Sequence, residues 1–288
     1  MEKYSFSSNA KVSIYTDIVG KTDNGRWNVE SIILPINIYD TININLNMQN
    51  LTNAKYKISE KEIYFSESCR EVATVIKNLS SFSSDNLGID IYIKKNIPIS
   101  SGLGGESANT TTIIKALNII LDTGLEIGRL FEISKAFGRD AFFFIYNQPA
   151  YIFLDDIYIF PIENRDYFKC FIINPEINFS QHKTKEIMSR NIPINPTKVD
   201  KRLILDAWRK KDLFLINSLL RNFITITLVP EYQKAFEIMD EIYRIAGVKP
   251  QFTGTGPCMI LFTDNNLEKI LKEYCKFNKI MFYAVEVL

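Results

Sequence analysis

The sequence predicts an α+β fold built from two lobes. The chain has 288 residues, a length that exceeds one minimal core and suits one large domain or two apposed lobes, of which we expect the second. Its opening alternates apolar and polar side chains as β-strands do, whereas its second half mixes short strand patterns with amphipathic helical patterns. We therefore expect an N-terminal domain over residues 1–160 and a C-terminal domain over residues 161–288.

Composition narrows the classes of function. The 34 basic and 33 acidic residues nearly balance, which argues against a dedicated nucleic-acid or membrane-surface binder. The four cysteines are scattered singly without a CxxC pair, and His182 is the one histidine, so zinc ribbons and multi-histidine metal sites are not expected. No apolar run approaches the length of a membrane span or an export signal. We expect a cytoplasmic protein whose acid–base chemistry uses Asp, Glu, Lys or Tyr.

The first elements are strands. Residues 4–18 alternate in polarity, and the turn-rich segment 20–25 (GKTDNG) predicts a hairpin. Two further strands are expected at 29–38 and 41–46, separated by Tyr39 and Asp40. The opening of the chain is therefore predicted to be mostly antiparallel β-sheet.

A strand, a glycine loop and a helix form the central part of the chain. Apolar residues at helical spacing predict an amphipathic helix over 66–80, and alternation predicts a strand over 89–95. The loop that follows runs directly into a helix reaching residue 120. Because this helix is apolar around most of its circumference, we expect it to be buried.

The glycine loop is the strongest local sign of ligand binding. Gly102, Gly104 and Gly105 can take positive φ, and Ser107 to Asn109 stand where a helix leaves N–H groups unpaired. Such a helix start attracts phosphate. The loop matches neither the Walker pattern nor the dinucleotide fingerprint. The alternative interpretation is a tight strand-to-helix connection without a ligand.

The remaining elements alternate between helices and strands. A helix over 125–137 ends at Gly138, close to Asp140 and the apolar run AFFFIY. The other predicted elements are strands at 150–154, 157–160 and 169–174, helices at 198–209, 212–226 and 231–246, and a strand–helix–strand tail that begins near the TGTG turn at 253–256. Taken singly, Asp140 is typical of a cap or turn residue and Lys11 of a solvated strand residue.

The order of these features resembles the GHMP kinases, named for galactokinase, homoserine kinase, mevalonate kinase and phosphomevalonate kinase. Within them, the pattern is most similar to 4-diphosphocytidyl-2-C-methyl-D-erythritol kinases. The matching segments are AKVS (10–13), NGRW (24–27), PISSGLGGESANTT (98–111), GRDAFFF (138–144) and TGTG (253–256). The resemblance implies a two-lobe fold with an N-terminal ribosomal protein S5-like α/β lobe and a C-terminal ferredoxin-like α+β lobe.

The resemblance also implies an activity and its residues. The expected reaction is ATP-dependent phosphorylation of the 2-hydroxyl of 4-diphosphocytidyl-2-C-methyl-D-erythritol, in the non-mevalonate route to isoprenoid precursors. Asp140 would be the catalytic base and Lys11 its partner. Ser107 would hold Mg²⁺, and a small-molecule alcohol would be the substrate of a monomer or homodimer. The residues implied to bind ATP are Lys95, Pro98, Ile99, Ser100, Ser101, Gly102, Leu103, Gly104, Gly105, Glu106, Ser107, Ala108 and Asn109, and those implied to bind substrate are Ser13, Arg26, Trp27 and His182.

Five positions depart from the pattern. Glu106 replaces a glycine and Ala108 a serine in the loop. Ser13, Arg26 and Trp27 replace Asn, Tyr and His at positions that the resemblance assigns to substrate. Two alternatives therefore stay open: a diverged GHMP kinase for another small alcohol or phosphorylated alcohol, and a catalytically inactive relative that binds a nucleotide or metabolite.

Overall fold

The computed structural model describes the chain except residues 1–2, 24, 26, 49–50, 60–61, 81–86, 139, 154–155, 163–167, 178, 180–182, 191, 193–199, 201 and 225–230. Its contacts divide the chain into two compact units. Unit 1 comprises residues 1–10, 38–98 and 104–147, and unit 2 comprises 11–37, 99–103 and 148–288. Two early segments thus cluster with the C-terminal half. The predicted domain boundary between residues 160 and 161 stays a prediction.

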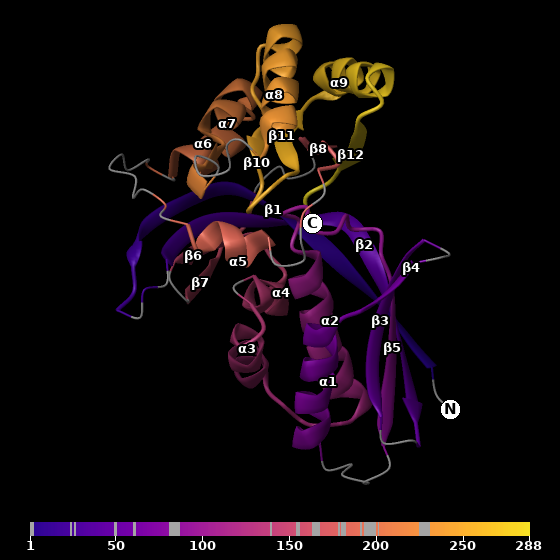
Figure 1. Cartoon of the computed structure of the whole chain (residues 1–288). Helices are drawn as coiled ribbons and strands as arrows, with labels where there is room; N and C mark the ends of the chain where they lie inside the picture. The colour runs from indigo at the N-terminus through magenta and orange to yellow at the C-terminus, as the bar shows by residue number, and fades with distance from the viewer. Residues whose placement is uncertain are drawn as a thin grey trace. The chain divides into compact units, whose positions relative to one another are not determined.

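Unit 1 is a sheet with helices packed on one side (Figure 1). The strand order is β4–β3–β5–β2–β1, with β3 parallel to β5 and the pairs β3–β4 and β2–β5 antiparallel. The strands are β1 (Lys3–Lys21), β2 (Trp27–Asn47), β3 (Thr52–Ser59), β4 (Glu62–Phe65) and β5 (Gly88–Lys94); the helices are α1 (Glu67–Leu79), α2 (Gly105–Ile120), α3 (Ile127–Lys135) and α4 (Ala141–Tyr146).

The core of unit 1 encloses α2. Alternate residues of β2 and β5, such as Ile42, Ile44 and Ile91, point toward the helices and are buried. Ile113, Ile114 and Leu117 of α2 belong to the same cluster, as do residues of α1, α3 and the end of α4. The predicted burial of this helix is confirmed. The start of α2, where the glycine loop ends, is therefore held on a rigid element.

Unit 2 contains a separate antiparallel sheet in the order β10–β11–β8–β12. Short strands also extend the unit 2 parts of β1 and β2, because β9 pairs with β1 and the β6–β7 hairpin pairs with β2. The strands are β6 (Ala150–Phe153), β7 (Asp156–Ile159), β8 (Lys169–Asn174), β9 (Arg221–Asn222), β10 (Gln251–Phe252), β11 (Met259–Thr263) and β12 (Met281–Val285); the helices are α5 (Lys183–Met188), α6 (Arg202–Arg209), α7 (Leu213–Leu219), α8 (Gln233–Ala246) and α9 (Asn265–Phe277).

Two predicted element boundaries are wrong. Tyr39 and Asp40 do not separate two strands, because β2 runs through them without a break. The predicted helix at 212–226 stops at Leu219, and Leu220 turns to an extended conformation with φ −57° and ψ 131°. Asn222 then donates from Nδ2 to the carbonyls of Phe252 at 3.0 Å and Gly254 at 2.6 Å. These tertiary hydrogen bonds hold the segment as β9 instead of helix.

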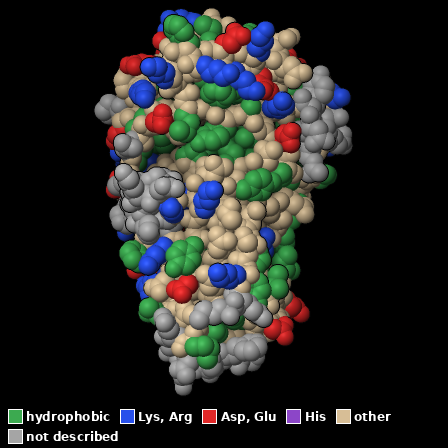
Figure 2. Space-filling view, turned by 90° about the vertical axis from the view of Figure 1, so that its right-hand side faces the viewer, with side chains coloured by type: hydrophobic (Ala, Val, Ile, Leu, Met, Phe, Trp, Pro, Cys, Tyr) green, Lys and Arg blue, Asp and Glu red, His purple; other side chains and the backbone are tan. Residues whose placement is uncertain are grey.

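The surface and the cysteines agree with the composition. On the face in Figure 2, basic and acidic side chains are scattered among one another instead of gathering by sign. Cys69, Cys170, Cys258 and Cys275 are all buried and free of disulfides. Among the helices of the described ranges, none is long and apolar enough to cross a membrane.

Candidate functional site

In unit 1, the glycine loop ends at a helix start whose N-cap residue is a glycine and makes no side-chain cap. Gly104 is the N-cap of α2, has φ 74° and makes no side-chain cap hydrogen bond. A side chain at Gly105 would crowd the preceding turn, because its Cβ would lie 3.0 Å from Ile97 Cγ2 and 3.1 Å from Lys95 Nζ. The first N–H groups of α2 thus receive no capping hydrogen bond from the N-cap residue. An anion fits such a terminus.

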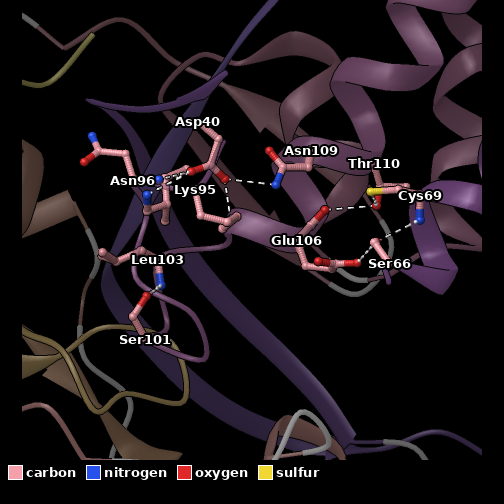
Figure 3. A network of polar contacts seen from close by, with 11 residues as sticks. Asp40, Ser66, Cys69, Lys95, Asn96, Ser101, Leu103, Glu106, Asn109 and Thr110 are labelled. Atoms are coloured by element: carbon pink, nitrogen blue, oxygen red, sulfur yellow. Dashed lines mark hydrogen bonds and ion pairs between the residues drawn. The ribbon is translucent and has the colours of Figure 1, made fainter. Parts of the chain in front are cut away.

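A buried carboxylate fixes the approach to this loop. Asp40 is fully buried and accepts hydrogen bonds from the backbone N–H of Asn96 at 2.7 Å and of Ile97 at 2.8 Å. It also accepts from Asn109 Nδ2 at 2.9 Å and forms an ion pair with Lys95, as Figure 3 shows. The structure thus uses Lys95 and Asn109, both predicted to bind ATP, to position the loop.

Asp40 was missed as a site residue, although the sequence contains a signal for it. Alternate residues of a strand share one face, and here that face contains Ile38, Asp40 and Ile42. Asp40 therefore lies on the apolar face of the strand. A carboxylate on that face needs a partner. Its buried position therefore follows from the same alternation that predicts the strand.

Glu106, the unusual acidic residue of the loop, is directed toward the start of α1. Its Oε1 accepts a hydrogen bond from Ser66 Oγ at 2.7 Å, and Ser66 Oγ also accepts from the N–H of Cys69 at 3.3 Å as the N-cap of α1 (Figure 3). Glu106 therefore links two helix starts. A carboxylate at this place is favoured by both helix dipoles.

Asp140 begins α4 close to the start of α2. It is half-buried and occupies the N-cap position without capping its own helix. Thr111 Oγ1 donates to the Ala141 carbonyl at 2.7 Å, which joins α4 to α2. A Cβ added to Gly138 would lie 3.5 Å from Ser107 Oγ. Within unit 1, the structure thus brings Asp140 to the same region as Ser107.

In unit 2, Lys11 is a buried lysine and not a solvated strand residue. It is 2% exposed, and its Nζ donates to Ser13 Oγ at 3.1 Å. Ser13 is held in turn because its backbone N–H donates to Thr253 Oγ1 at 2.8 Å. A Cβ at Gly254 would approach Lys11 Nζ to 3.2 Å. The ammonium therefore lies against the TGTG turn.

The first part of the glycine loop, residues 99–103, packs on the same turn. Gly102 has φ 87°, and a Cβ there would lie 2.1 Å from the Thr253 carbonyl oxygen, so only glycine fits. Cys258 N–H donates to Ser101 O at 3.1 Å, and Lys11 N–H donates to Leu103 O at 3.0 Å. The two glycine turns that the sequence singles out are thus in direct contact.

Lys183 is a site residue that the sequence did not reveal. It is 3% exposed and donates from Nζ to the carbonyls of Ser100, at 2.5 Å, and Gly256. Burial lowers its pKa to about 7, with a further lowering from the charge of Lys11. Its neighbours in the sequence are polar, which is typical of an exposed segment, so the sequence gives no sign that Lys183 is buried.

The residues predicted to bind substrate have structural partners of their own. Trp27 is 8% exposed and donates from Nε1 to Met188 O at 2.8 Å. The Lys21 Nζ atom lies over its ring, 3.9 Å from the ring centroid. Ser13 contacts Lys11 as described. Arg26 and His182 lie outside the described residues. Their roles, and that of the exposed Ile99, stay predictions.

The geometry gathers the predicted residues in two groups. Unit 1 contains the end of the loop, Ser107 and Asp140, whereas unit 2 contains Lys11, residues 99–103, the TGTG turn and Lys183. The pairing of Lys11 with Asp140 stays a prediction. No cluster of three or more His, Cys, Asp or Glu residues suited to a metal occurs in the part of the chain that is described. Ser107 as a metal ligand also stays a prediction.

Known proteins resemble this chain along most of its length. Residues 69–148 match the family described as GHMP kinases N terminal domain. The chain is 26% identical over 272 residues to the 4-diphosphocytidyl-2-C-methyl-D-erythritol kinase of Alkaliphilus oremlandii, covering 89% of this chain and 87% of that protein. An identically named protein of Prochlorococcus marinus subsp. pastoris is 26% identical over 298 residues, covering 98% and 94%.

A solved structure extends the likeness to the fold. The crystal structure of a 4-(cytidine 5'-diphospho)-2C-methyl-D-erythritol kinase superposes with a TM-score of 0.76 at 14% identity and covers 99% of each chain. The predicted two-lobe α+β fold is confirmed. The family match is thus confined to residues 69–148, whereas the similarity in fold to the solved kinase extends over the whole chain.

Proposed function

We propose that the protein is an ATP-dependent kinase that phosphorylates the 2-hydroxyl of 4-diphosphocytidyl-2-C-methyl-D-erythritol. The observation that carries the proposal is the likeness to kinases of that name over 89% and 98% of this chain. The uncapped start of α2 on a buried helix supports the same proposal, because phosphoryl transfer needs a rigid cradle for polyphosphate.

The residues fit ATP and Mg²⁺ in charge and geometry. Backbone N–H groups at the start of α2 suit phosphate oxygens. The carboxylate of Glu106 is hydrogen-bonded to Ser66, and this bond reduces its repulsion of a phosphate bound there. Bound ATP supplies the phosphoryl group that is transferred. Mg²⁺ in kinase sites keeps several waters and is held by the substrate phosphates with one or two carboxylates. A cluster of three acidic residues, which does not occur among the described residues, is therefore not required.

Asp140 and Lys11 have distinct proposed roles. Asp140 accepts the proton of the substrate hydroxyl while its oxygen bonds to the γ-phosphorus, the bond from that phosphorus to the bridging oxygen breaks and ADP leaves; taking this proton is the task of a base in the reaction. Lys11 supplies positive charge to the transferring group. Its contact with Ser13 and its position beside the TGTG turn hold the ammonium in one place.

The test is phosphate transfer to 4-diphosphocytidyl-2-C-methyl-D-erythritol, followed by product detection, for the wild type and Asp140→Asn. Because asparagine keeps the shape but cannot take the proton, we expect kcat to fall by about 10²- to 10⁴-fold. Asp122→Asn is the matched control, since Asp122 is exposed and has φ 42°, which asparagine tolerates. Unchanged turnover in Asp140→Asn would exclude Asp140 as the base.

A diverged acceptor is the second candidate. Trp27 donates its indole N–H to Met188 O, and Ser13 is engaged with Lys11, so these two positions offer a different set of groups from the family pattern. Screening small alcohols and phosphorylated alcohols for ADP release decides between the acceptors. Nucleotide binding without any phosphorylated product would instead favour an inactive relative.

A further inference from the structure

Lys183 is buried between the two glycine turns of unit 2. It lies in α5 and is 3% exposed. Its Nζ atom donates to the carbonyl of Ser100 in the 99–103 loop and to the carbonyl of Gly256 in the TGTG turn. Two acceptors need two N–H donors, and a lysine has at least two in either protonation state. One side chain thus joins two backbone turns that are far apart in the sequence.

The loop that Lys183 holds contains a strained residue. Ser100 has φ 52°, in the left-handed region that residues with a side chain rarely adopt. Its carbonyl is one of the two acceptors of Lys183. Beside it, the loop contacts the TGTG turn through a backbone hydrogen bond from Cys258 N–H to Ser101 O at 3.1 Å. Lys183 therefore supports the strained part of the loop at the place where it packs on the other turn.

Stability alone does not explain a lysine at this position. Burial lowers the pKa of Lys183 to about 7, and the charge of Lys11 on β1 contributes to the lowering. The charged form of Lys183 is therefore disfavoured in the folded protein. A side chain with this cost, whose two hydrogen bonds end on two different turns, indicates that the relative position of those turns matters.

Both turns also hold the segment of β1 that contains Lys11. The backbone N–H of Lys11 donates to Leu103 O at 3.0 Å, at the end of the 99–103 loop. The backbone N–H of Ser13 donates to Thr253 Oγ1 at 2.8 Å, at the start of the TGTG turn. The Lys11 ammonium in turn donates to Ser13 Oγ at 3.1 Å. A shift of one turn relative to the other would therefore move the Lys11 ammonium.

We propose that Lys183 is a positioning residue for Lys11: it holds the 99–103 loop against the TGTG turn and thereby fixes the β1 segment that presents the Lys11 ammonium. Lys183 contacts neither substrate nor nucleotide in this role. The inference rests on the proposed function for what Lys11 does in the reaction. Because Lys11 is proposed to stabilise charge that develops in the transition state, a misplaced Lys11 should lower kcat more than it raises KM.

Amide hydrogen exchange, followed by two-dimensional NMR, tests the placement of Lys11 without any substrate. In Lys183→Met, we expect the backbone N–H groups of Lys11, Ser13 and Cys258 to exchange about tenfold faster than in the wild type, because the two turns lose their shared support. Unchanged rates at these three groups would overturn the proposal. A purely structural role would instead accelerate exchange throughout unit 2.

Asn217→Ala is the matched control, because Asn217 is also buried in unit 2 and also makes two hydrogen bonds to the backbone. Its Nδ2 donates to Phe262 O at 2.9 Å, and its Oδ1 accepts from Phe262 N–H at 2.8 Å, on β11. In this variant the Phe262 N–H should exchange faster, while the three N–H groups at the turns keep their wild-type rates. In Lys183→Met the Phe262 rate should stay unchanged. Equal acceleration at all four groups in Lys183→Met overturns the proposal.

Steady-state kinetics of phosphate transfer test the consequence for the reaction. Lys183→Met should lower kcat about tenfold to a hundredfold and leave the KM for ATP and for the alcohol within about threefold of the wild type. Asn217→Ala should keep the wild-type kcat. In a Lys11→Met background, Lys183→Met should cause no further fall in kcat, because it acts through the residue already removed. An equally large further fall contradicts a role through Lys11.

The outcome is separable from the test of the kinase activity. Faster exchange confined to the turns, without phosphorylation of any alcohol, supports the placement of Lys11 by Lys183 and contradicts the proposed function. Phosphorylation by the wild type, with exchange accelerated throughout unit 2 or with an unchanged kcat in Lys183→Met, supports the function and contradicts the positioning role. Thermal unfolding of each variant gives the temperature below which all of them are folded and can be compared.

Discussion

Asp40 shows how a single buried residue can order a loop that it does not belong to. Its carboxylate receives two backbone N–H groups from residues 96 and 97, one amide from α2 and the ammonium of Lys95. The Lys95 side chain is 7% exposed and that of Asp40 is fully buried. An ion pair in this environment is stabilising only while both charges and their hydrogen bonds are present. The approach to the glycine loop thus depends on one carboxylate of β2.

Asp40→Asn should lower the free energy of unfolding by about 3–5 kcal/mol, because it leaves the Lys95 ammonium buried without its countercharge. Urea denaturation measures the difference. Asp90→Asn is the matched control: Asp90 accepts from Asn47 at 2.7 Å and Asn53 at 3.1 Å, both amides. We expect that control to lose about 1 kcal/mol. Equal losses in the two variants would contradict a special role for the Asp40–Lys95 pair.

Lys183 makes stability depend on pH in a defined direction. Its pKa is lowered to about 7 in the folded protein, whereas an unfolded lysine titrates near its ordinary value of about 10.4. Between these values the unfolded state binds a proton that the folded state has released, so this residue's contribution to stability rises with pH. Below pH 7 both states are charged, and the cost of burying the charge is present in full.

We therefore expect the free energy of unfolding of the wild type, relative to Lys183→Met, to increase between pH 7 and pH 9.5 by about 1 kcal/mol per pH unit. Denaturant titrations at intervals of half a pH unit measure this difference. Taking the difference from the variant cancels the other titrating groups. A constant difference across that range would mean that Lys183 keeps an ordinary pKa.

The individual site residues differ in how far the sequence could predict them. Asp40 was predictable in principle, since strand alternation places it among buried isoleucines. Lys183 was not, because its burial results from carbonyls of two turns that are distant in the sequence. Lys95 and Asn109 were recognised as important, but their contacts with Asp40 give them a structural role that motif order does not contain.

At the scale of elements, the starts of α1 and α2 form one coupled unit. Ser66 accepts from Cys69 N–H as the N-cap of α1 and donates to Glu106 in the first turn of α2. The Ser66 hydroxyl thus accepts from a backbone N–H at the start of α1 and also donates to the Glu106 carboxylate. Because Glu106 stands beside the proposed nucleotide cradle, the cap of one helix influences the charge at the start of the other.

Ser66→Ala should cost about 1–2 kcal/mol of stability through loss of the cap, measured by urea denaturation. It should also weaken ATP binding in calorimetry, since Glu106 loses the hydrogen bond that directs it to α1. Glu106→Gln is the control, because an amide oxygen still accepts from Ser66 without a negative charge. That variant should bind ATP at least as tightly as the wild type. Weaker binding in Glu106→Gln would indicate that the negative charge itself assists the ligand.

Local periodicity predicted most elements, and tertiary contacts explain the exceptions. The predicted helices at 66–80 and 231–246 and the strand at 89–95 correspond to α1, α8 and β5 within two residues at each end. The break expected at Tyr39 and Asp40 is absent because Asp40 is satisfied by the loop instead of forming a turn. The helix expected to reach 226 ends early because Asn222 bonds to the segment around Gly254.

At the scale of the whole molecule, the chain passes repeatedly from one compact unit to the other. Both β1 and β2 contribute residues to each unit, and the 99–103 segment of the glycine loop clusters with unit 2, whereas α2 belongs to unit 1. Neither unit is a continuous stretch of sequence. The length of the chain and its polarity patterns predicted two lobes, but no local signal in the sequence marks the points at which the chain crosses from one unit to the other.

Separate expression of residues 1–160 and 161–288 should therefore give two fragments that do not fold cooperatively. The second fragment lacks residues 11–37 and 99–103, which make part of its unit, including Lys11 and the partners of the TGTG turn. Thermal melts followed by circular dichroism, together with proton NMR dispersion, measure this. A cooperative transition in either fragment alone would support the simple boundary at residue 160.

The burial of all four cysteines makes the native protein a convenient host for site-specific fluorophores. Each thiol is shielded, and burial raises the pKa of each above its ordinary value, so thiolate is scarce at neutral pH. Maleimide dyes should leave the folded wild type unlabelled. One cysteine introduced at an exposed position in each unit, such as Asp122 and Lys185, then gives a donor–acceptor pair against a silent background. Energy transfer in that pair would report the distance between the units as nucleotide is added.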